Sequence, residues 1–414
     1  MILTQEYKDN WSPFSKILFR FVFSYVILYI LLMFVSSSLE SVIVSIGKQI
    51  LGIGHDFVAN GRGSGDTTFA YVTLFINAIG ALTIGTLWSI LDKKRPSYNK
   101  LFYWFLVIVR IYLVLFMFFY GFVKVFKVQF PSPSLMRLLQ PLGEFSPMGL
   151  AWTYMGYSKG FNLFAGGMEV LGGLLLIPRR TQTLGAFVVM GVMLQVAMMN
   201  FMFDIPVKIF SVHLILFAAI IFITDIKRFV SVFITNKATQ PYKYFHPIDD
   251  RLYHKIIFWL KIGLAVLIMG GISWQMHTTE KSRGDKREKS PLYGIWEAQI
   301  FIKNNDTIPP LITDDKRWRY LILDYKNRAS TKSMNDHINS YDFEIDTTKN
   351  RINVDGNEEN GHYFNYTRKG KDYLILNGWF YYDSLKIHLT RKDHTKFELI
   401  NRGFHWINEY PRNQ

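Results

Sequence analysis

Long apolar runs divided by short polar breaks constrain this chain more than any other feature. Between Phe161 and Phe217, three such runs follow one another, interrupted only by a Pro-Arg-Arg break at 178–180 and an Asp-Ile-Pro break at 204–206. Runs of this length with such tight breaks are typical of consecutive membrane-spanning helices rather than of a water-soluble core. The sequence therefore predicts an integral membrane protein, with the lipid bilayer as its first partner.

Seven runs are long enough to be candidate spans, which predicts an all-α polytopic membrane bundle. The first run is too long for a cleavable signal peptide and lacks a small-residue cleavage site, so we expect it to be retained as the first helix. The seven runs are Ile17–Val35, Phe69–Leu91, Leu101–Phe126, Phe161–Ile177, Thr183–Asn200, Val207–Thr224 and Ile256–Met276.

Basic residues indicate how these spans are oriented. Lys and Arg gather at 92–100, 179–180 and 227–255, whereas the turn at 203–206 carries neither. Loops rich in Lys and Arg stay on the cytoplasmic side of a membrane. One orientation satisfies all seven spans. In it, the N-terminus is cytoplasmic and the chain after Met276 is extracytoplasmic, as expected for a protein of the bacterial inner membrane.

Composition separates an apolar part of the chain from a polar part. Half of the 414 residues are hydrophobic, yet the mean hydropathy is only +0.11, so part of the chain must be soluble. A net charge of +15 would suggest nucleic acid in a soluble protein, but most cations before Met276 lie at the ends of apolar runs. We therefore expect no nucleic-acid partner. The chain has no cysteine, which excludes disulfides, thiolate chemistry and iron–sulfur ligation.

The polar part begins with a charged linker at 279–290 and continues with the pattern of β structure. Alternating apolar residues between Asn, Asp, Gly and Lys clusters predict about eight short strands, which fit a small antiparallel barrel or sandwich. The opening Leu292–Trp296 and the closing Asn401–Trp406 are similar to a lipocalin-like barrel. The clearest strands are Trp318–Tyr325, Tyr341–Ile345, Tyr373–Leu376, Ser384–Leu389 and Phe397–Ile400.

The segment Gln129–Gly160, between the third and fourth spans, is too rich in Pro and Gly for one continuous helix. Its Trp and Tyr residues predict short helices at the outer membrane interface. The expected domains are two N-terminal helices with an external loop (1–100), a four-helix membrane module (101–230), a cytoplasmic loop with the seventh helix (231–278), the linker (279–290) and an extracytoplasmic β domain (291–414).

Glu169 is the carboxylate placed most deeply in a candidate span. On a helix it shares one face with Ala165, Gly172 and Gly173, and such small residues let a neighbouring helix approach closely. A carboxylate at this depth must be protonated or paired, and Arg110 of the third span lies at a matching depth. The pair would either fix helix packing or act as a proton-handling or ligand-binding group, since ionisable groups inside a membrane mark functional sites by default.

Asn200, Asp204 and Lys208 follow at steps of four between the fifth and sixth spans. In one interpretation, Asp204 is the N-cap of the sixth span and Lys208 extends toward the interface. In the other, the three residues form an outer polar pocket with Tyr120, Lys124 and Gln195.

His213 is the one histidine inside a candidate span. A haem held by two histidines, or a metal site, would need further ligands, and no histidine in the polar part shows metal-ligand spacing. We interpret His213 as a packed, hydrogen-bonded residue, and we expect no metal. The sequence also contains no phosphate loop, dinucleotide fingerprint or nucleophile elbow.

From about Leu101 to Val230 the chain resembles the DoxX-like family of membrane proteins. That family has a four-helix membrane module, which would correspond to the third to sixth spans. Its name comes from a subunit of a thiosulfate:quinone oxidoreductase, and other relatives are tied to membrane redox and oxidative-stress functions. Here the chain adds two N-terminal spans, a seventh span and the β domain. The stretches that carry the resemblance are Phe119–Phe126, Gln129–Pro131, Pro141–Gly143, Trp152–Gly156, Phe164–Glu169, Arg179–Thr181 and Met199–Lys208.

The resemblance implies a redox-associated membrane protein that binds a quinone, the one cofactor to expect, or a similar lipid-soluble ligand. A membrane redox partner would then exchange electrons with it. Glu169 and Arg110 would balance charge in the pocket, with Tyr120, Lys124, Asn200 and Asp204 at its outer mouth. The alternative is a non-catalytic transporter or envelope scaffold whose β domain binds a lipid or a protein partner. Whether the protein is an enzyme stays open at this point.

Overall fold

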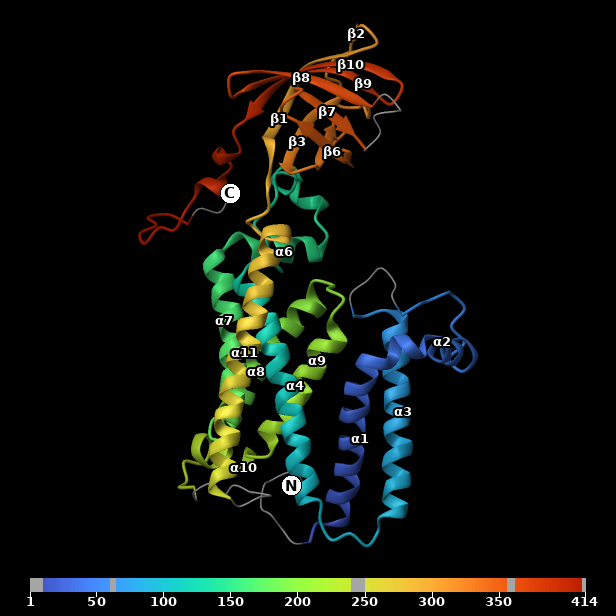
Figure 1. Cartoon of the computed structure of the whole chain (residues 1–414), viewed down its shortest axis with the longest axis vertical. Helices are drawn as coiled ribbons and strands as arrows, with labels where there is room; N and C mark the ends of the chain where they lie inside the picture. The colour runs from blue at the N-terminus through green and yellow to red at the C-terminus, as the bar shows by residue number, and fades with distance from the viewer. Residues whose placement is uncertain (1–9, 60–64, 240–249, 356–361, 412–414) are drawn as a thin grey trace. The chain divides into compact units, whose positions relative to one another are not determined.

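A computed structural model of the protein describes residues 10–59, 65–239, 250–355 and 362–411. It divides into two compact units (Figure 1). The helical unit comprises Met1–Val125 and Gly160–Met276, and the β unit comprises Phe126–Lys159 and His277–Gln414. The predicted cytoplasmic loop includes residues 240–249, which lie outside the described residues.

The helical unit is built from long apolar helices, with α1 and α3 side by side at one end (Figure 1). All seven predicted spans are helical. The helices are α1 (Pro13–Val35), α2 (Glu40–Gln49), α3 (Thr68–Leu91), α4 (Asn99–Val125), α7 (Lys159–Leu176), α8 (Gln182–Met202), α9 (Lys208–Ile223), α10 (Ile226–Phe233) and α11 (Arg251–Arg283), with a 3-10 turn at Ser36–Leu39 after α1.

Within the described residues, five helices are long and apolar enough to cross a membrane: α1 with its continuation, α3, α4, α8 and α11. The count rises to six if α9 and α10, which meet at a bend of 76°, form one span. Helix α7 falls outside this set because Lys159, Asn162, Glu169 and several glycines make it less apolar than the others. A count of seven spans therefore remains a prediction.

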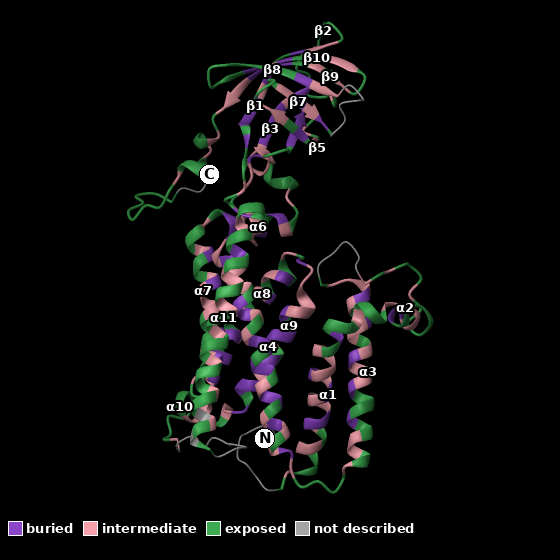
Figure 2. Ribbon diagram, in the orientation of Figure 1, coloured by how far each residue is buried: buried purple, intermediate pink, exposed green. Residues whose placement is uncertain are grey.

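The helices of this unit expose many apolar side chains on their outer surface. Helix α4 contributes more residues to the core than any other helix, including Val109, Leu113 and Met117, which pack with Leu214 and Phe217 of α9. By contrast, the apolar side chains of α11 are exposed along its length (Figure 2). Exposed apolar surface on this scale is unfavourable in water and is typical of helices that cross a bilayer.

The β unit contains an antiparallel sheet that closes almost completely into a barrel. The strand order is β5-β4-β3-β1-β10-β9-β8-β7-β6, with β2 paired to β1 off this path. The strands are β1 (Lys289–Lys303), β2 (Asp306–Thr307), β3 (Trp318–Tyr325), β4 (Ala329–Ser333), β5 (Ile338–Tyr341), β6 (Phe343–Asp346), β7 (Arg351–Val354), β8 (Tyr363–Lys369), β9 (Tyr373–Phe380) and β10 (Asp383–Lys392). The predicted small antiparallel barrel is thus confirmed, with more strands than expected.

The segment that joins α4 to α7 belongs to the β unit. It contains the short helices α5 (Leu135–Leu139) and α6 (Pro147–Tyr157) and a 3-10 turn at Leu142–Glu144, as its Pro and Gly content predicted. Leu135 packs against Ile295, Tyr320 and Ile322 on the outside of the sheet. This segment therefore covers part of the barrel, a contact that its own sequence does not predict.

Two local predictions for the polar part are wrong. Residues 279–283 continue α11 instead of forming a linker, because Glu280, Lys281 and Arg283 favour a helix and its C-terminal dipole favours cations. The predicted strand Phe397–Ile400 is helical, since a 3-10 turn capped by Asp393 leads into the short helix α12 (Glu398–Asn401). The apolar residues there alternate by chance and do not join the sheet.

Candidate functional site

Two of the ionisable residues that the helical unit buries, Lys124 and Glu169, form a close ion pair. The ammonium Nζ of Lys124, near the end of α4, lies 2.8 Å from Oε1 and 3.0 Å from Oε2 of Glu169 in α7. The Glu169 side chain is 1% exposed and the Lys124 side chain 6%. The Lys124 ammonium also lies 5.6 Å from the centroid of the Tyr120 ring, so both charges are compensated within the protein.

Small residues bring the two helices close enough for this pair. A Cβ atom added to Gly166 would lie 2.5 Å from the carbonyl oxygen of Gly121, and one added to Gly121 would lie 2.8 Å from the carbonyl oxygen of Gly166. The backbones of α4 and α7 are therefore in direct contact one turn from Lys124 and Glu169. Gly173, on the predicted face of Glu169, has no room for a Cβ beside Phe118 of α4 (2.9 Å), so the small residues of that face also allow close helix packing.

The expected pairing of Glu169 with Arg110 is wrong. Arg110 donates to the backbone carbonyls of Leu176 (Nε, 3.0 Å) and Ile177 (Nη2) at the end of α7. These carbonyls are left without partners where a helix ends, and a cation there also complements the helix dipole. Arg110 thus anchors the end of α7, and Lys124, expected at the pocket mouth, is the partner of Glu169.

The residues expected around an outer polar pocket are distributed over separate hydrogen-bonded pairs. Asn200 is buried and donates to Ser211 Oγ (3.1 Å), which ties α8 to α9. The side chain of Asp204 is 87% exposed and accepts from Lys208 Nζ (3.0 Å). Each of these contacts stabilises the α8–α9 turn, and none of them leaves an open polar site.

Asp66, rather than Asp204, caps α9. Its carboxylate accepts from the backbone N–H groups of Lys208 (2.6 Å) and Ile209 (3.0 Å). Asp204 cannot do so because its backbone lies in the left-handed region, with φ of 50°, and its side chain points to solvent. The capping residue therefore comes from a loop more than a hundred residues earlier in the chain, where sequence spacing could not identify it.

Replacing Asp66 by alanine is expected to cost about 0.5–2 kcal/mol of stability, because two backbone donors of α9 lose their acceptor. Unfolding of the detergent-purified protein measures the change. Asp204→Ala is the control and should shift stability by no more than about 0.5 kcal/mol, as for other exposed surface positions. Equal effects of the two variants would contradict the assignment of the cap.

A cavity of about 310 Å³ lies between α1, α3 and α9. Most of its wall is apolar, with residues such as Leu32, Phe69, Leu74 and Phe210. Tyr29, Ser36, Ser37, Thr67 and Thr73 add polar groups to the lining. Asn77 of α3 also lines the cavity, is 1% exposed, and has neither side-chain amide atom hydrogen-bonded to any described residue. The amide faces the hydroxyl of Tyr25 without meeting hydrogen-bond geometry.

A buried amide without partners is costly unless a bound molecule supplies them. Such a group costs about 1–3 kcal/mol in a protein interior, so it persists where a ligand or an ordered water satisfies it. A cavity that is largely apolar and contains a few polar groups is the usual form of a small-molecule site. Asn77 therefore marks this cavity as the candidate ligand site of the helical unit.

His213 of α9 forms a polar cluster beside the cavity. Its Nδ1 lies 2.7 Å from the carbonyl of Ile209, and its Nε2 lies 2.9 Å from the hydroxyl of Tyr25. Because a carbonyl only accepts, Nδ1 carries a hydrogen, and Nε2 of the neutral ring accepts from Tyr25. The ring stacks on Tyr29, a cavity residue, with 3.9 Å between centroids. The predicted hydrogen-bonded packing of His213 is confirmed.

Sequence reasoning missed Asn77 and Tyr29. Both were available as polar groups inside candidate spans, and the uncharged amide in the second apolar run was the signal that could have found the site. The described residues contain no group of three His, Cys, Asp or Glu side chains that could hold a metal ion.

Comparison with known proteins identifies a relative without a described activity. The protein YwoB of Bacillus subtilis (strain 168), described as uncharacterized, is 32% identical over 133 residues. The match covers 30% of this chain and 79% of YwoB. No family model matches the chain, and no solved structure matches it.

Proposed function

The chain belongs to the same family as Bacillus subtilis YwoB, whose name carries no activity, so we propose a function from the geometry: the helical unit binds a quinone or another lipid-soluble ligand in the cavity lined by Asn77. The protein is an integral membrane protein of the DoxX-like type with seven spans, a cytoplasmic N-terminus and an extracytoplasmic β domain. The distribution of Lys and Arg supports this orientation. The observation that carries the proposal is the unpartnered, buried amide of Asn77 at an apolar cavity.

The chemistry of the cavity suits a ring that bears oxygen atoms. The Asn77 amide offers a donor and an acceptor, so it could bind the carbonyl of a quinone or the hydroxyl of the reduced form. Tyr29 supplies an aromatic surface, and the apolar walls suit an isoprenoid or acyl chain. A redox partner in the membrane would exchange electrons with the ligand. Lys124 and Glu169, which satisfy each other, serve in this proposal to hold α4 against α7.

Mass spectrometry of an organic extract from the detergent-purified protein tests the proposal. We expect a quinone in stoichiometric amount in the wild type and its loss in Asn77→Leu. The variant should fold at least as well as the wild type, since an unsatisfied buried amide costs about 1–3 kcal/mol. Loss of ligand would then be separable from loss of structure.

Thr83→Val is the matched control, because Thr83 lies on the same helix, is exposed, and binds only the carbonyl of Ile79. This variant should retain the ligand. Glu169→Gln should reduce stability and leave the ligand identity unchanged. Absence of any lipid-soluble molecule other than bulk phospholipid from the wild type, or full retention by Asn77→Leu, would contradict the proposal.

A second candidate function is a non-catalytic transporter or envelope scaffold whose β unit binds a lipid or protein partner. Exposed aromatic residues near the C-terminus favour it: Phe404 is 78% exposed, Trp406 90% and Tyr410 84%. Under this proposal, deletion of residues 279–414 abolishes function and Asn77→Leu has no effect. The two proposals predict opposite results from the same pair of variants.

A further inference from the structure

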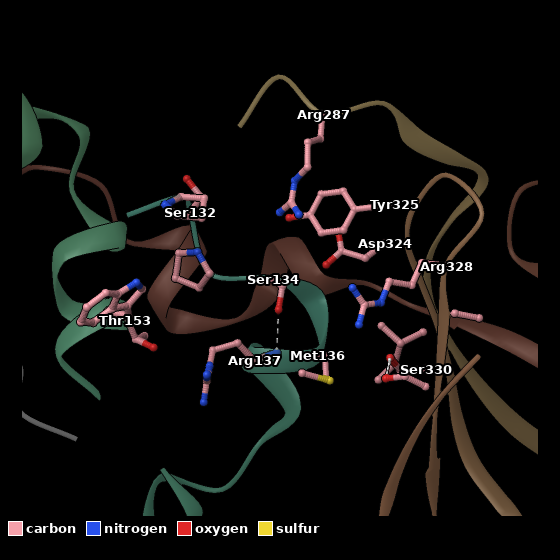
Figure 3. Close-up of a pocket in the computed structure, with 16 residues that line it drawn as sticks. Ser132, Ser134, Met136, Arg137, Thr153, Arg287, Asp324, Tyr325, Arg328 and Ser330 are labelled. Carbon is pink, nitrogen blue, oxygen red and sulfur yellow. Dashed lines mark hydrogen bonds between the residues drawn. The ribbon is translucent and has the colours of Figure 1, made fainter. Parts of the chain in front are cut away.

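A cleft of about 320 Å³ lies within the β unit, where the segment before α5 meets β3, β4 and β5 (Figure 3). Its volume falls within the range of about 300–1,000 Å³ that is usual for small-molecule sites. The apolar residues of its lining include Pro131, Met136, Trp152 and Ile322. This part of the cleft is apolar and would suit the organic part of a ligand.

Three arginines from different segments line the same cleft: Arg137 of α5, Arg287 before β1 and Arg328 in the turn between β3 and β4. Asp324 is the one acidic side chain in the lining, so the cleft carries an excess of positive charge. Arg137 donates to Gln140 Oε1 (2.7 Å), and the Arg287 guanidinium lies over the Tyr325 ring, 3.3 Å from its centroid. These contacts orient two of the cations, and neither contact is with a carboxylate.

Arg328 is the cation with the least compensation. Its guanidinium makes no hydrogen bond or ion pair with any residue that the structure describes, and it extends from the sheet toward the segment that carries Ser134 (Figure 3). Ala329 and Ser330, which follow it, are buried in the sheet, so the base of the side chain is fixed. Arg328 is itself exposed, and an arginine fork at the rim of a cleft is suited to bind an anion.

Asp324 opposes the arginines and has a structural partner of its own. Its carboxylate accepts from the backbone N–H of Leu135 (2.9 Å), which fixes the start of α5 against β3. Burial raises the pKa of this carboxyl, while the hydrogen bond from Leu135 and the charges of Arg287 and Lys289 act in the opposite direction. The negative charge of Asp324 would weaken the binding of an anion. Removing that charge should therefore make an anion bind more tightly.

We propose that this cleft binds a phosphate ester, with the phosphate between Arg287 and Arg328 and the organic part against the apolar wall. A tetrahedral phosphate can accept from arginines that approach from several directions, whereas one guanidinium fork satisfies a planar carboxylate. The phosphate could belong to a membrane phospholipid or to a soluble metabolite. The site is independent of the cavity at Asn77.

Calorimetric titration of the full chain in dodecyl maltoside tests the site with three probes. Dioctanoyl phosphatidylglycerol represents a phospholipid, glycerol 1-phosphate represents a soluble phosphate ester, and dioctanoylglycerol is the phosphate-free control. We expect at least one phosphate-bearing probe to bind and dioctanoylglycerol not to bind. Binding of the lipid alone would identify a phospholipid as the source, and binding of glycerol 1-phosphate would identify a soluble ester.

Arg328→Gln should lower the affinity for the phosphate probe about tenfold or more, because it removes charge-assisted hydrogen bonds. Arg368→Gln is the matched control, because Arg368 is an exposed arginine of β8 outside the cleft. This variant should bind the phosphate probe with the affinity of the wild type. Asp324→Asn keeps an acceptor for Leu135 and removes a negative charge that repels the phosphate. The affinity for the phosphate probe should therefore rise about threefold or more. Tighter binding cannot result from misfolding.

Three results would overturn the proposal. The first is the absence of binding by either phosphate-bearing probe. The second is equal binding of dioctanoylglycerol, which would show that the phosphate contributes nothing. The third is an equal loss of affinity in Arg328→Gln and Arg368→Gln, which would show that the net charge of the protein, and not the cleft, determines binding.

Discussion

Replacing Lys124 by methionine is expected to destabilise the protein by about 3–5 kcal/mol, because it leaves Glu169 as an uncompensated buried carboxylate. The Glu169 side chain is 1% exposed, and Lys124 Nζ lies within hydrogen-bond distance of both of its oxygens. Glu169→Leu should have a similar cost, since it leaves the Lys124 ammonium without its counter-ion. Unfolding in mixed detergent and SDS micelles measures both changes.

The double variant Lys124→Met with Glu169→Leu separates the loss of a partner from the value of the pair. Replacement of a whole buried ion pair by apolar side chains is often neutral or stabilising, so most of the stability should return. A double variant as unstable as the sum of the two single variants would show that the pair contributes more than mutual compensation. A cost below about 1 kcal/mol for either single change would mean that water reaches the pair.

Replacing Trp296 by alanine is expected to destabilise the β unit by about 3–5 kcal/mol, the usual cost of removing a large aromatic side chain from a core. Trp296 is fully buried among the residues that fill the barrel, and its indole N–H donates to the carbonyl of Leu292 (2.9 Å). The variant therefore leaves a cavity and an unpaired carbonyl. Thermal unfolding, followed by near-ultraviolet circular dichroism, measures the change.

Trp406→Ala is the matched control, because Trp406 is 90% exposed. It should change stability by no more than about 0.5 kcal/mol. The contrast also tests the likeness to a lipocalin-like barrel. Trp296, in the opening segment, lies in the core of the barrel, and Gly294 leaves room for Arg391 beside its indole. The closing segment Asn401–Trp406 contributes no strand and no core residue to the barrel.

The sequence alone predicts the elements well, because apolar periodicity is a local property. Each predicted span is a helix, and the predicted strand Trp318–Tyr325 coincides with β3 residue for residue. The small residues beside Glu169 also predict the close packing of α7. These features depend on neighbours along the chain, which the sequence displays directly.

The partners of individual side chains could not be predicted in the same way. Arg110 and Lys124 lie on one helix, and which of them reaches Glu169 depends on how α4 is rotated about its axis. The cap of α9 and the phosphate-ester cleft depend on long-range contacts. Asp66 and Lys208 lie 142 residues apart, and Leu135 and Asp324 lie 189 apart. Periodicity carries no information about such pairs.

The position of β1 within the sheet has a consequence for biosynthesis. Although β1 is the first strand of the sheet to be made, it pairs with β10, whose residues 383–392 lie near the C-terminus. Contacts this distant in sequence form slowly, and β1 exposes an unpaired edge until β10 is available. The barrel therefore cannot be completed during translation of its first nine strands, and a ribosome that stalls before residue 392 would release a chain prone to aggregation.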